Sequence, residues 1–395
     1  MITDNPVASA IKNNDFAEAQ KLLADGDNFP EGVNEYSLST LYQSILSAKA
    51  FGIIDTLIDK GKFESDIYEY DSLKRSIFKT LFKSWPTDRE SLDYLENFIK
   101  KLSNINDEVE GETLLSFALA EGTDPLIIKA LIDAGCSTDF RNVAEENLVY
   151  QVANSTTVKP EVTLQYLSLL LDHGIDINEP NVAGTTALQE AVQRVKREVI
   201  TVLLANGANP NEVDQKGESA FYAALVHLSD AKIYAELSEN HQVDFEQRTR
   251  EGETILSAFL RMMQVSESAF KLLEQLIDDG ANLKEASTYY SKNKSGIDWV
   301  AEKKSPVLIA LIHKGAIEVN DQDDEGNTLL HKVCAVDSNY DQEVAKDTYR
   351  KVKLLIESGA DAGITNNKDE TAMMLASKDN LKTKTVEILL SANAK

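Results

Sequence analysis

The sequence Gly184-Thr185-Thr186-Ala187-Leu188 recurs in altered form as Gly217-Glu218-Ser219-Ala220-Phe221 and as Gly252-Glu253-Thr254-Ile255-Leu256. Gly217 follows Gly184 by 33 residues, and Gly252 follows Gly217 by 35. Related phrases begin at Gly111 and Gly326. A period of this length is typical of solenoids built from stacked two-helix units, which present extended binding surfaces. The repeat therefore predicts an all-α fold and a function in recognition.

A second phrase follows the first at a fixed separation. It is a pair of aliphatic residues, then a glycine, a small residue and often Asn or Asp, as in residues 203–209, 276–282 and 354–361. Together the two phrases resemble the ankyrin repeat, whose signature is Gly-x-Thr-Pro-Leu-His-x-Ala-Ala. The signature proline is replaced in every phrase, and only His331 keeps the histidine. The resemblance covers nearly the whole chain and implies an ankyrin-repeat solenoid of about eleven helix-turn-helix units, several with loop insertions.

The repeats predict one array over residues 1–395. Residues 1–106 are interpreted as diverged N-terminal repeats, 107–365 as recognisable repeats and 366–395 as a C-terminal capping repeat. In each unit the first glycine is expected at a positive φ, the following Thr or Ser is expected to cap the first helix, and the second glycine is expected to end the second helix. Residues 73–102 lack the glycine phrase but keep the helical spacing of apolar residues.

The charge of the chain limits its partners. The 65 acidic and 40 basic residues give a net charge of −25, which repels nucleic acids and anionic membranes and attracts a basic protein. An alternative is that the acidic excess only maintains solubility. Two cysteines, no apolar run of membrane-spanning length and no signal-like start indicate a cytoplasmic protein without disulfides.

The sequence offers no catalytic, cofactor or metal motif, and we expect a protein that is not an enzyme. Residues 321–326 look like the start of a calcium loop, but Lys332 stands where a bidentate Glu is required. Cys136 and Cys334 are interpreted as small core residues, and His331 as a buried residue that hydrogen-bonds between units. The enzymatic alternative needs a cryptic domain in residues 73–106, which is shorter than a usual catalytic domain.

Four insertions interrupt the period, at residues 154–161, 264–269, 284–295 and 337–349, and are expected to form loops. The third contains Tyr289 and Tyr290, at least one of which is expected to be exposed, although a ring packed beneath the loop is an alternative. Trp299 is expected in the core.

The resemblance implies that partners contact the hairpin tips and the first helices on the concave side. The predicted partner-binding residues, for each of which plain solvated surface is the alternative, are Gln193, Arg194, Lys216, Glu218, Tyr222, His227, Arg250, Glu251, Glu253, Arg261, Met262, Tyr289 and Tyr290.

These observations predict a protein–protein interaction module that binds another protein, of basic character, on its concave face. Within this class we favour an inhibitor or immunity-type protein that clamps its partner, because complementary charge raises the association rate. A bacterial effector or an assembly scaffold that recruits a partner would have a similar sequence. The chain is expected to be a monomer on its own, with an adaptor that dimerises through its last repeat as the alternative.

Overall fold

The structure is a computed structural model that describes residues 5–30 and 35–393 of the chain. It divides into two compact units, Met1–Ala208 and Asn209–Lys395, and each is described by itself. A single array over the whole chain remains a prediction. The end-to-end contact considered for the last repeat concerns residues 386–395, of which 394 and 395 lie outside the described residues.

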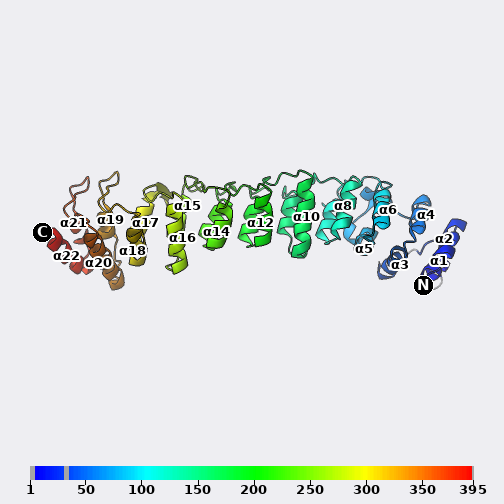
Figure 1. Ribbon diagram of the computed structural model, residues 1–395, viewed down its shortest axis with the longest axis horizontal. Helices are drawn as coiled ribbons and strands as arrows, with labels where there is room; N and C mark the ends of the chain where they lie inside the picture. The colour runs from blue at the N-terminus through cyan, green and yellow to red at the C-terminus, as the bar shows by residue number, and fades with distance from the viewer. Residues whose placement is uncertain (1–4, 31–34, 394–395) are drawn as a thin grey trace. The chain divides into compact units, whose positions relative to one another are not determined.

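Unit 1 is a stack of six helix pairs within its described residues, with two short 3₁₀ turns (Figure 1). First helices pack on first helices, as α9 does on α7 and α11, and second helices pack on second helices, as α10 does on α8 and α12. The elements are α1 (Pro6–Lys12), α2 (Phe16–Asp25), α3 (Glu35–Ser47), α4 (Phe51–Asp59), η2 (Ile67–Glu69), η3 (Leu73–Arg75), α5 (Ile77–Ser84), α6 (Arg89–Ile99), α7 (Leu114–Ala120), α8 (Pro125–Asp133), α9 (Leu148–Asn154), α10 (Pro160–Asp172), α11 (Ala187–Gln193) and α12 (Arg197–Ala205).

Unit 2 adds five helix pairs and one antiparallel β-hairpin in the part that the structure describes. The same stacking recurs, with α17 between α15 and α19, and α18 between α16 and α20. Its elements are α13 (Ala220–Tyr222), the π-helical turn η4 (Ala223–Leu228), α14 (Ala231–Ser238), α15 (Ile255–Met262), α16 (Glu267–Asp278), β1 (Ala286–Tyr289), β2 (Lys292–Ser295), α17 (Gly296–Glu302), α18 (Ser305–Lys314), α19 (Leu329–Ala335), α20 (Gln342–Glu357), α21 (Ala372–Ala376), η5 (Asn380–Lys382) and α22 (Thr383–Asn393).

Eleven helix pairs in residues 5–30 and 35–393 confirm the all-α repeat fold and match the expected number of units. The pair formed by α5 and α6 lies in the region that lacks the glycine phrase, so this region is also a two-helix unit. The apolar spacing buries Phe78, Leu81 and Phe82 on one side of α5, and the Ser76 side chain caps this helix by accepting from Phe78 N.

The phrase residues act as expected. Thr186 caps α11 and receives a hydrogen bond from Gln189 N, while the Gln189 side chain accepts from Thr186 N, which makes a capping box. Gly207 ends the same repeat with a φ of 89°. Gly217 has a φ of 76°, and a Cβ there would lie 2.6 Å from the Arg248 carbonyl oxygen of the next hairpin loop. Close stacking of successive hairpin loops therefore requires glycine at this position.

Two of the insertions are not the irregular loops that were expected. Residues 286–295 form the hairpin β1–β2, in which Tyr289 pairs with Lys292. Residues 342–349 are the first turns of α20, because Asp341 caps the helix by accepting from Glu343 N and no Gly or Pro interrupts it. The insertion therefore lengthens the second helix instead of the loop before it.

Buried polar residues join neighbouring repeats. His331 Nδ1 lies 2.8 Å from Thr328 Oγ1 and its Nε2 lies 3.1 Å from Glu370 O in the following repeat. Cys136 and Cys334 are buried free thiols. These positions confirm the sequence interpretation of all three residues.

Candidate functional site

The inner strip of unit 2 consists of the hairpin loops and first helices of three successive repeats, from Glu218 on the first to Glu302 on the third. Most of the predicted partner-binding residues lie in it, and the contacts described below link Glu218, Tyr222, His227, Glu253, Arg261, Met262, Tyr289 and Tyr290.

Glu218 and His227 form the first group of the strip. Glu218 Oε2 lies 2.9 Å from His227 Nε2, and this hydrogen bond lowers the pKa of the Glu218 carboxyl. The His227 ring packs edge-on against Tyr222, with ring centroids 5.3 Å apart. Burial, followed by the charges of Glu218 and Glu253, raises the pKa of Tyr222 to about 12. The Tyr222 hydroxyl is therefore neutral at ordinary pH.

The first helix of this repeat contains a π-helical turn, η4, after the short α13. It ends at Ser229, which has a φ of 51°. A π turn holds an extra residue in a helix and is frequent at functional sites. Here the π turn accommodates one residue more between the hairpin loop and His227 than the next repeat has between its loop and Arg261.

The second group is an ion pair around a buried carboxylate. Glu253 is only 6% exposed, and Arg261 donates to both of its oxygens, from Nε at 2.9 Å and from Nη2 at 2.8 Å. Such two-point contacts fix the guanidinium plane. The hydrogen bonds to Glu253 raise the pKa of Arg261. Met262, the next residue, is half exposed and its sulfur lies 3.0 Å from Arg261 Nη1.

The hairpin places an aromatic group beside this ion pair. The Arg261 guanidinium carbon lies 5.0 Å from the centre of the Tyr289 ring, which in turn packs edge-on against Trp299 at 5.1 Å. Tyr290 packs on Tyr289 at 4.7 Å and is 85% exposed. Both sequence alternatives for the tyrosine pair hold, because one ring is packed and the other is exposed.

The turn of this hairpin has unusual residues for its shape. Tyr290 and Ser291 have φ values of 44° and 62°. Two successive positive φ values define the tight turn that normally selects Asn-Gly. A tyrosine in this backbone region is strained, and such strain concentrates at functional positions.

Trp299, Lys294 and Glu302 complete the strip, although none was among the predicted residues. Trp299 is buried, as expected, and donates to Ser257 Oγ at 2.7 Å. Lys294 Nζ lies 4.0 Å from the centre of the Trp299 ring and 2.7 Å from Glu302 Oε1. The tyrosine pair was the sequence signal that could have pointed to Lys294, because Lys294 follows it closely and lies on the strand that pairs with β1.

The remaining predicted residues make fewer contacts. Lys216 and Arg250 are exposed on successive hairpin loops, joined by a backbone hydrogen bond from Arg250 N to Lys216 O of 2.6 Å, and Glu251 is exposed beside them. Gln193 and Arg194 belong to unit 1, where both are exposed. They are described with that unit and are not placed relative to the strip.

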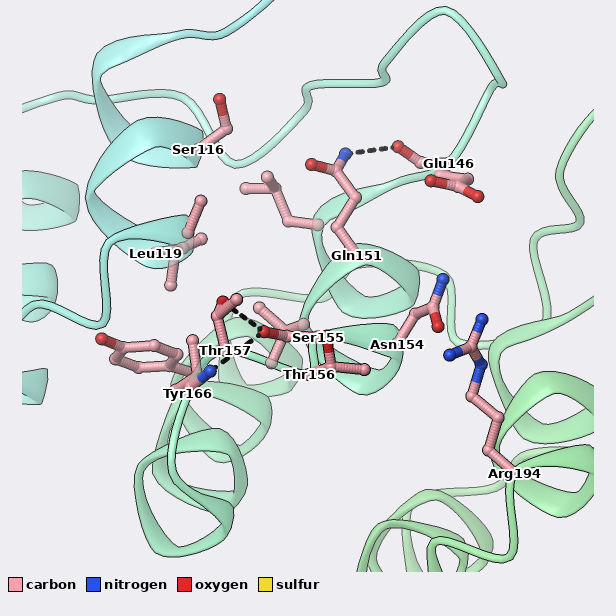
Figure 2. Close-up of a pocket in the computed structure, with 14 residues that line it drawn as sticks. Ser116, Leu119, Glu146, Gln151, Asn154, Ser155, Thr156, Thr157, Tyr166 and Arg194 are labelled. Atoms are coloured by element: carbon pink, nitrogen blue, oxygen red, sulfur yellow. Dashed lines mark hydrogen bonds between the residues drawn. The ribbon is translucent and has the colours of Figure 1, made fainter. Parts of the chain in front are cut away.

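Unit 1 has a pocket of about 390 Å³ between α7 and α9 (Figure 2). Leu119 from α7 and Leu148 and Val152 from α9 give it apolar walls, and residues 155–158 of the first insertion close one side. Gln151 and Asn154 of α9 face it, and Arg194 approaches from the end of α11. Sequence reasoning named Arg194 but missed the pocket, because its walls come from segments far apart in the chain.

A larger cavity of about 890 Å³ in unit 2 is lined mainly by polar residues of two successive repeats. Lys332 lies in it and pairs with Asp298 and Asp323, each at 2.6 Å. Asp323 belongs to the segment that looked like a calcium loop, and its carboxylate is engaged by this lysine.

Residues 5–30 and 35–393 contain no group of three or more His, Cys, Asp or Glu side chains arranged to hold a metal ion. None of the helices in these ranges combines the length and apolar character that a bilayer crossing requires.

Comparison with known families identifies three ankyrin repeats over residues 115–214. The B-cell lymphoma 3 protein homolog of Mus musculus is 26% identical over 213 residues, which cover 53% of this chain and 44% of the relative. NF-kappa-B inhibitor delta of Mus musculus is 28% identical over 221 residues, which cover 51% of this chain and 64% of the relative. The matches thus span less than two thirds of these relatives' own length.

Among solved structures, the ankyrin repeat domain of Bcl-3 matches with a TM-score of 0.49 and 20% identity, covering 62% of this chain and 97% of that one. The matched family repeats include the Thr186 phrase that first indicated the fold. Residues 115–214 are therefore ankyrin repeats, which belong to a family of protein-interaction modules.

Proposed function

We propose that the chain binds another protein through the inner strip of unit 2 and thereby inhibits it. The strip combines Tyr, Trp, Arg and Met, the residue types that dominate the energetics of protein interfaces. It has the extended form of a docking surface, and its charged groups are paired with one another rather than arranged around a reacting atom. This arrangement supports a binding role in preference to a catalytic one.

The exposed ring of Tyr290 is the observation on which the proposal mainly rests. A strained turn holds it at the end of a hairpin, next to a packed row of Tyr289, Trp299 and Arg261. An exposed aromatic side chain on a rigid support loses little conformational entropy on binding, and such side chains are frequent hot spots.

The proposed partner is a basic protein. The net charge of −25 would attract it and raise its association rate. Glu251 is an exposed carboxylate at a hairpin tip next to the strip, and Asp324 is another in a later hairpin loop. The name of NF-kappa-B inhibitor delta describes an inhibitor, which supports an inhibitory role for a related array of repeats.

A pull-down with the full chain as bait, washed at low and then at high salt, tests this proposal. We expect one basic protein that is released as salt rises, because screening weakens steering and exposed ion pairs. Its activity is then measured with and without the chain. Recovery of several unrelated acidic proteins, or of a partner whose activity is unchanged, would contradict an inhibitor of a basic protein.

Two matched tyrosine variants then locate the surface. Tyr290→Ala should weaken binding of the recovered partner by more than about tenfold, since hot-spot truncations remove 2 kcal/mol or more. Tyr36→Ala is the control, because Tyr36 is 82% exposed but lies on α3 of unit 1. Equal effects of the two variants would rule out the strip as the binding surface.

A further inference from the structure

We propose that the pocket between α7 and α9 in unit 1 binds a lysine or arginine side chain of the partner protein. The inference rests on the proposed function, which supplies a basic partner, and adds a specific anchor to it. Its volume of about 390 Å³ lies within the range of sites that enclose small ligands.

The walls of the pocket suit the stem of a long basic side chain. Leu119, Leu148 and Val152 are buried residues that line it. Lysine and arginine bury their methylene groups on such surfaces while their charged ends reach polar groups. An apolar wall with a polar rim is therefore matched by an amphipathic side chain better than by a wholly apolar one.

Two side-chain amides of α9 supply hydrogen-bond acceptors beside the apolar walls. Asn154 Oδ1 is buried and, within the described part of the chain, receives no hydrogen bond. Gln151 donates from Nε2 to Glu146 O at 2.7 Å, and its Oε1 remains an acceptor. A buried acceptor without a donor is unfavourable, and a lysine or arginine supplies donors only.

The charges around the rim also favour a cation. Arg194 lines the pocket, but its Nε donates to Glu190 Oε1 at 2.5 Å, so its charge is compensated within its own repeat. Glu146 lines the pocket as well, and its Oε2 accepts from the neutral Asn142 Nδ2 at 2.7 Å. Of the charged side chains that line the pocket, Arg194 is thus paired with a carboxylate, whereas Glu146 is bound by a neutral amide and can pair with a cation.

The closing loop is held in place, which favours a preformed pocket. Lys196 Nζ donates to the carbonyl oxygens of Ala153 at 2.8 Å and Ser155 at 2.6 Å. Val158 N donates to Ser155 Oγ at 3.3 Å within the loop. A site that is ordered before binding loses less entropy when it is filled.

The test uses the full chain with methyl-labelled Leu and Val, and acetyl-Gly-Arg-Gly-amide as the probe. Titration should shift the methyl signals of Leu119, Leu148 and Val152 saturably. The lysine peptide should behave alike, and the norleucine and glutamate peptides should bind at least about tenfold more weakly, the value of one charge-assisted hydrogen bond. Equal binding of norleucine, tighter binding of glutamate, or absence of saturable shifts would overturn the proposal.

Three variants separate loss of recognition from loss of folding. The methyl spectrum of each variant shows directly whether it is folded. Asn154→Leu should weaken the arginine probe about fivefold or more, and Asn154→Asp should strengthen it, because the acceptor gains a charge. Asn206→Leu is the matched control, because Asn206 is exposed at the end of α12 and does not line the pocket. Unchanged affinity in both Asn154 variants would overturn the proposal.

Failure of the pocket assignment can be distinguished from failure of the proposed function. If the arginine probe fails but the recovered partner still binds, only the pocket assignment is wrong. If the probe binds but no basic partner is recovered, the proposed function is wrong and the pocket remains a cation-binding site.

Discussion

Glu218 and His227 are nine residues apart and form the same contact that Glu253 and Arg261, or Glu370 and Lys378, form at a separation of eight. In each of these three repeats an acid of the hairpin loop reaches a base at the end of the first helix, at 2.9, 2.8 and 2.7 Å. The turn η4 accommodates the additional residue of the first pair. The helix thus changes its local geometry while the pairing pattern is kept.

Glu218→Gln should flatten the dependence of stability on acid pH. The folded state lowers the Glu218 pKa from 4.5, so its contribution is present above that value and is lost as pH falls through the folded pKa. Urea unfolding midpoints measured from about pH 3 to 6 should fall less steeply in the variant than in the parent chain. Glu251→Gln, at an exposed tip, is the control. Identical slopes for parent and Glu218→Gln would contradict the expectation.

His331→Gln should remove a second pH dependence. Burial lowers the His331 pKa below 6.5, so the unfolded chain takes up a proton more readily and stability falls as pH drops below 6.5. Gln189 occupies the equivalent capping-box position in another repeat, where its Oε1 accepts from Thr186 N at 2.6 Å. The variant should therefore keep its stability at pH 8 within about 1 kcal/mol and lose the slope between about pH 5 and 7. Chemical denaturation at each pH measures the stability and its change with pH. If stability changes with pH equally in the variant and the parent chain, a group other than His331 causes the dependence.

Arg261→Ala should destabilise unit 2 by about 3 kcal/mol, because it leaves the buried Glu253 carboxylate without its counter-ion. The double variant Arg261→Ala/Glu253→Gln should recover part of this loss. Hydrogen exchange of α15 amides reports the local effect. A double variant less stable than Arg261→Ala would show that the carboxylate is held mainly by other groups.

Relaxing the hairpin turn should separate stability from binding. Tyr290→Asn with Ser291→Gly supplies the residues that this turn prefers and should raise the unfolding midpoint, by about 1 kcal/mol in free energy. The same change removes the exposed ring and should weaken partner binding about tenfold or more. Thermal unfolding and a binding titration are measured on the same sample. A gain in stability with unchanged affinity would mean that the strained turn has no role in recognition.

Lys351→Met should cost about 2 kcal/mol or more, since Lys351 Nζ donates to Ala301 O at 2.7 Å and to Lys303 O at 2.9 Å in a buried site. Lys353→Met is the matched control, because Lys353 lies on the same helix with its side chain 55% exposed. Denaturant midpoints compare the two. Equal losses would indicate that helix propensity rather than the buried contacts is responsible.

The parts of the fold that sequence predicts are those that local chemistry determines. Gly217 and Thr186 have their roles because of φ and capping, which act within a few residues. The turn η4 gives no such signal, because Ser229 takes the left-handed conformation without being glycine. The turn at Tyr290 could not be predicted either, because its sequence is not the Asn-Gly that indicates a two-residue hairpin turn.

The candidate site divides in the same way. Alignment of the repeats predicted that Glu218, Tyr222 and His227 share one face, because the hairpin loop and the first helix occupy the same place in every repeat. The Figure 2 pocket depends instead on Leu119, Gln151 and Arg194 meeting from three repeats. No spacing within one repeat encodes that meeting, and the partner-binding role of both surfaces stays a prediction.

The lysines that connect successive repeats have a consequence for any rearrangement of the repeats. Each of these lysines donates to carbonyl oxygens at the end of the first helix in the preceding repeat. Lys303 donates to Arg261 O, and Lys382 donates to Cys334 O and Val336 O. Lys351 makes the same kind of contact with Ala301 O. The end of one repeat is therefore completed by a residue that its successor encodes. Duplicating, deleting or exchanging one of these repeats therefore changes two such junctions at once, and each new neighbour must supply or accept the lysine contact.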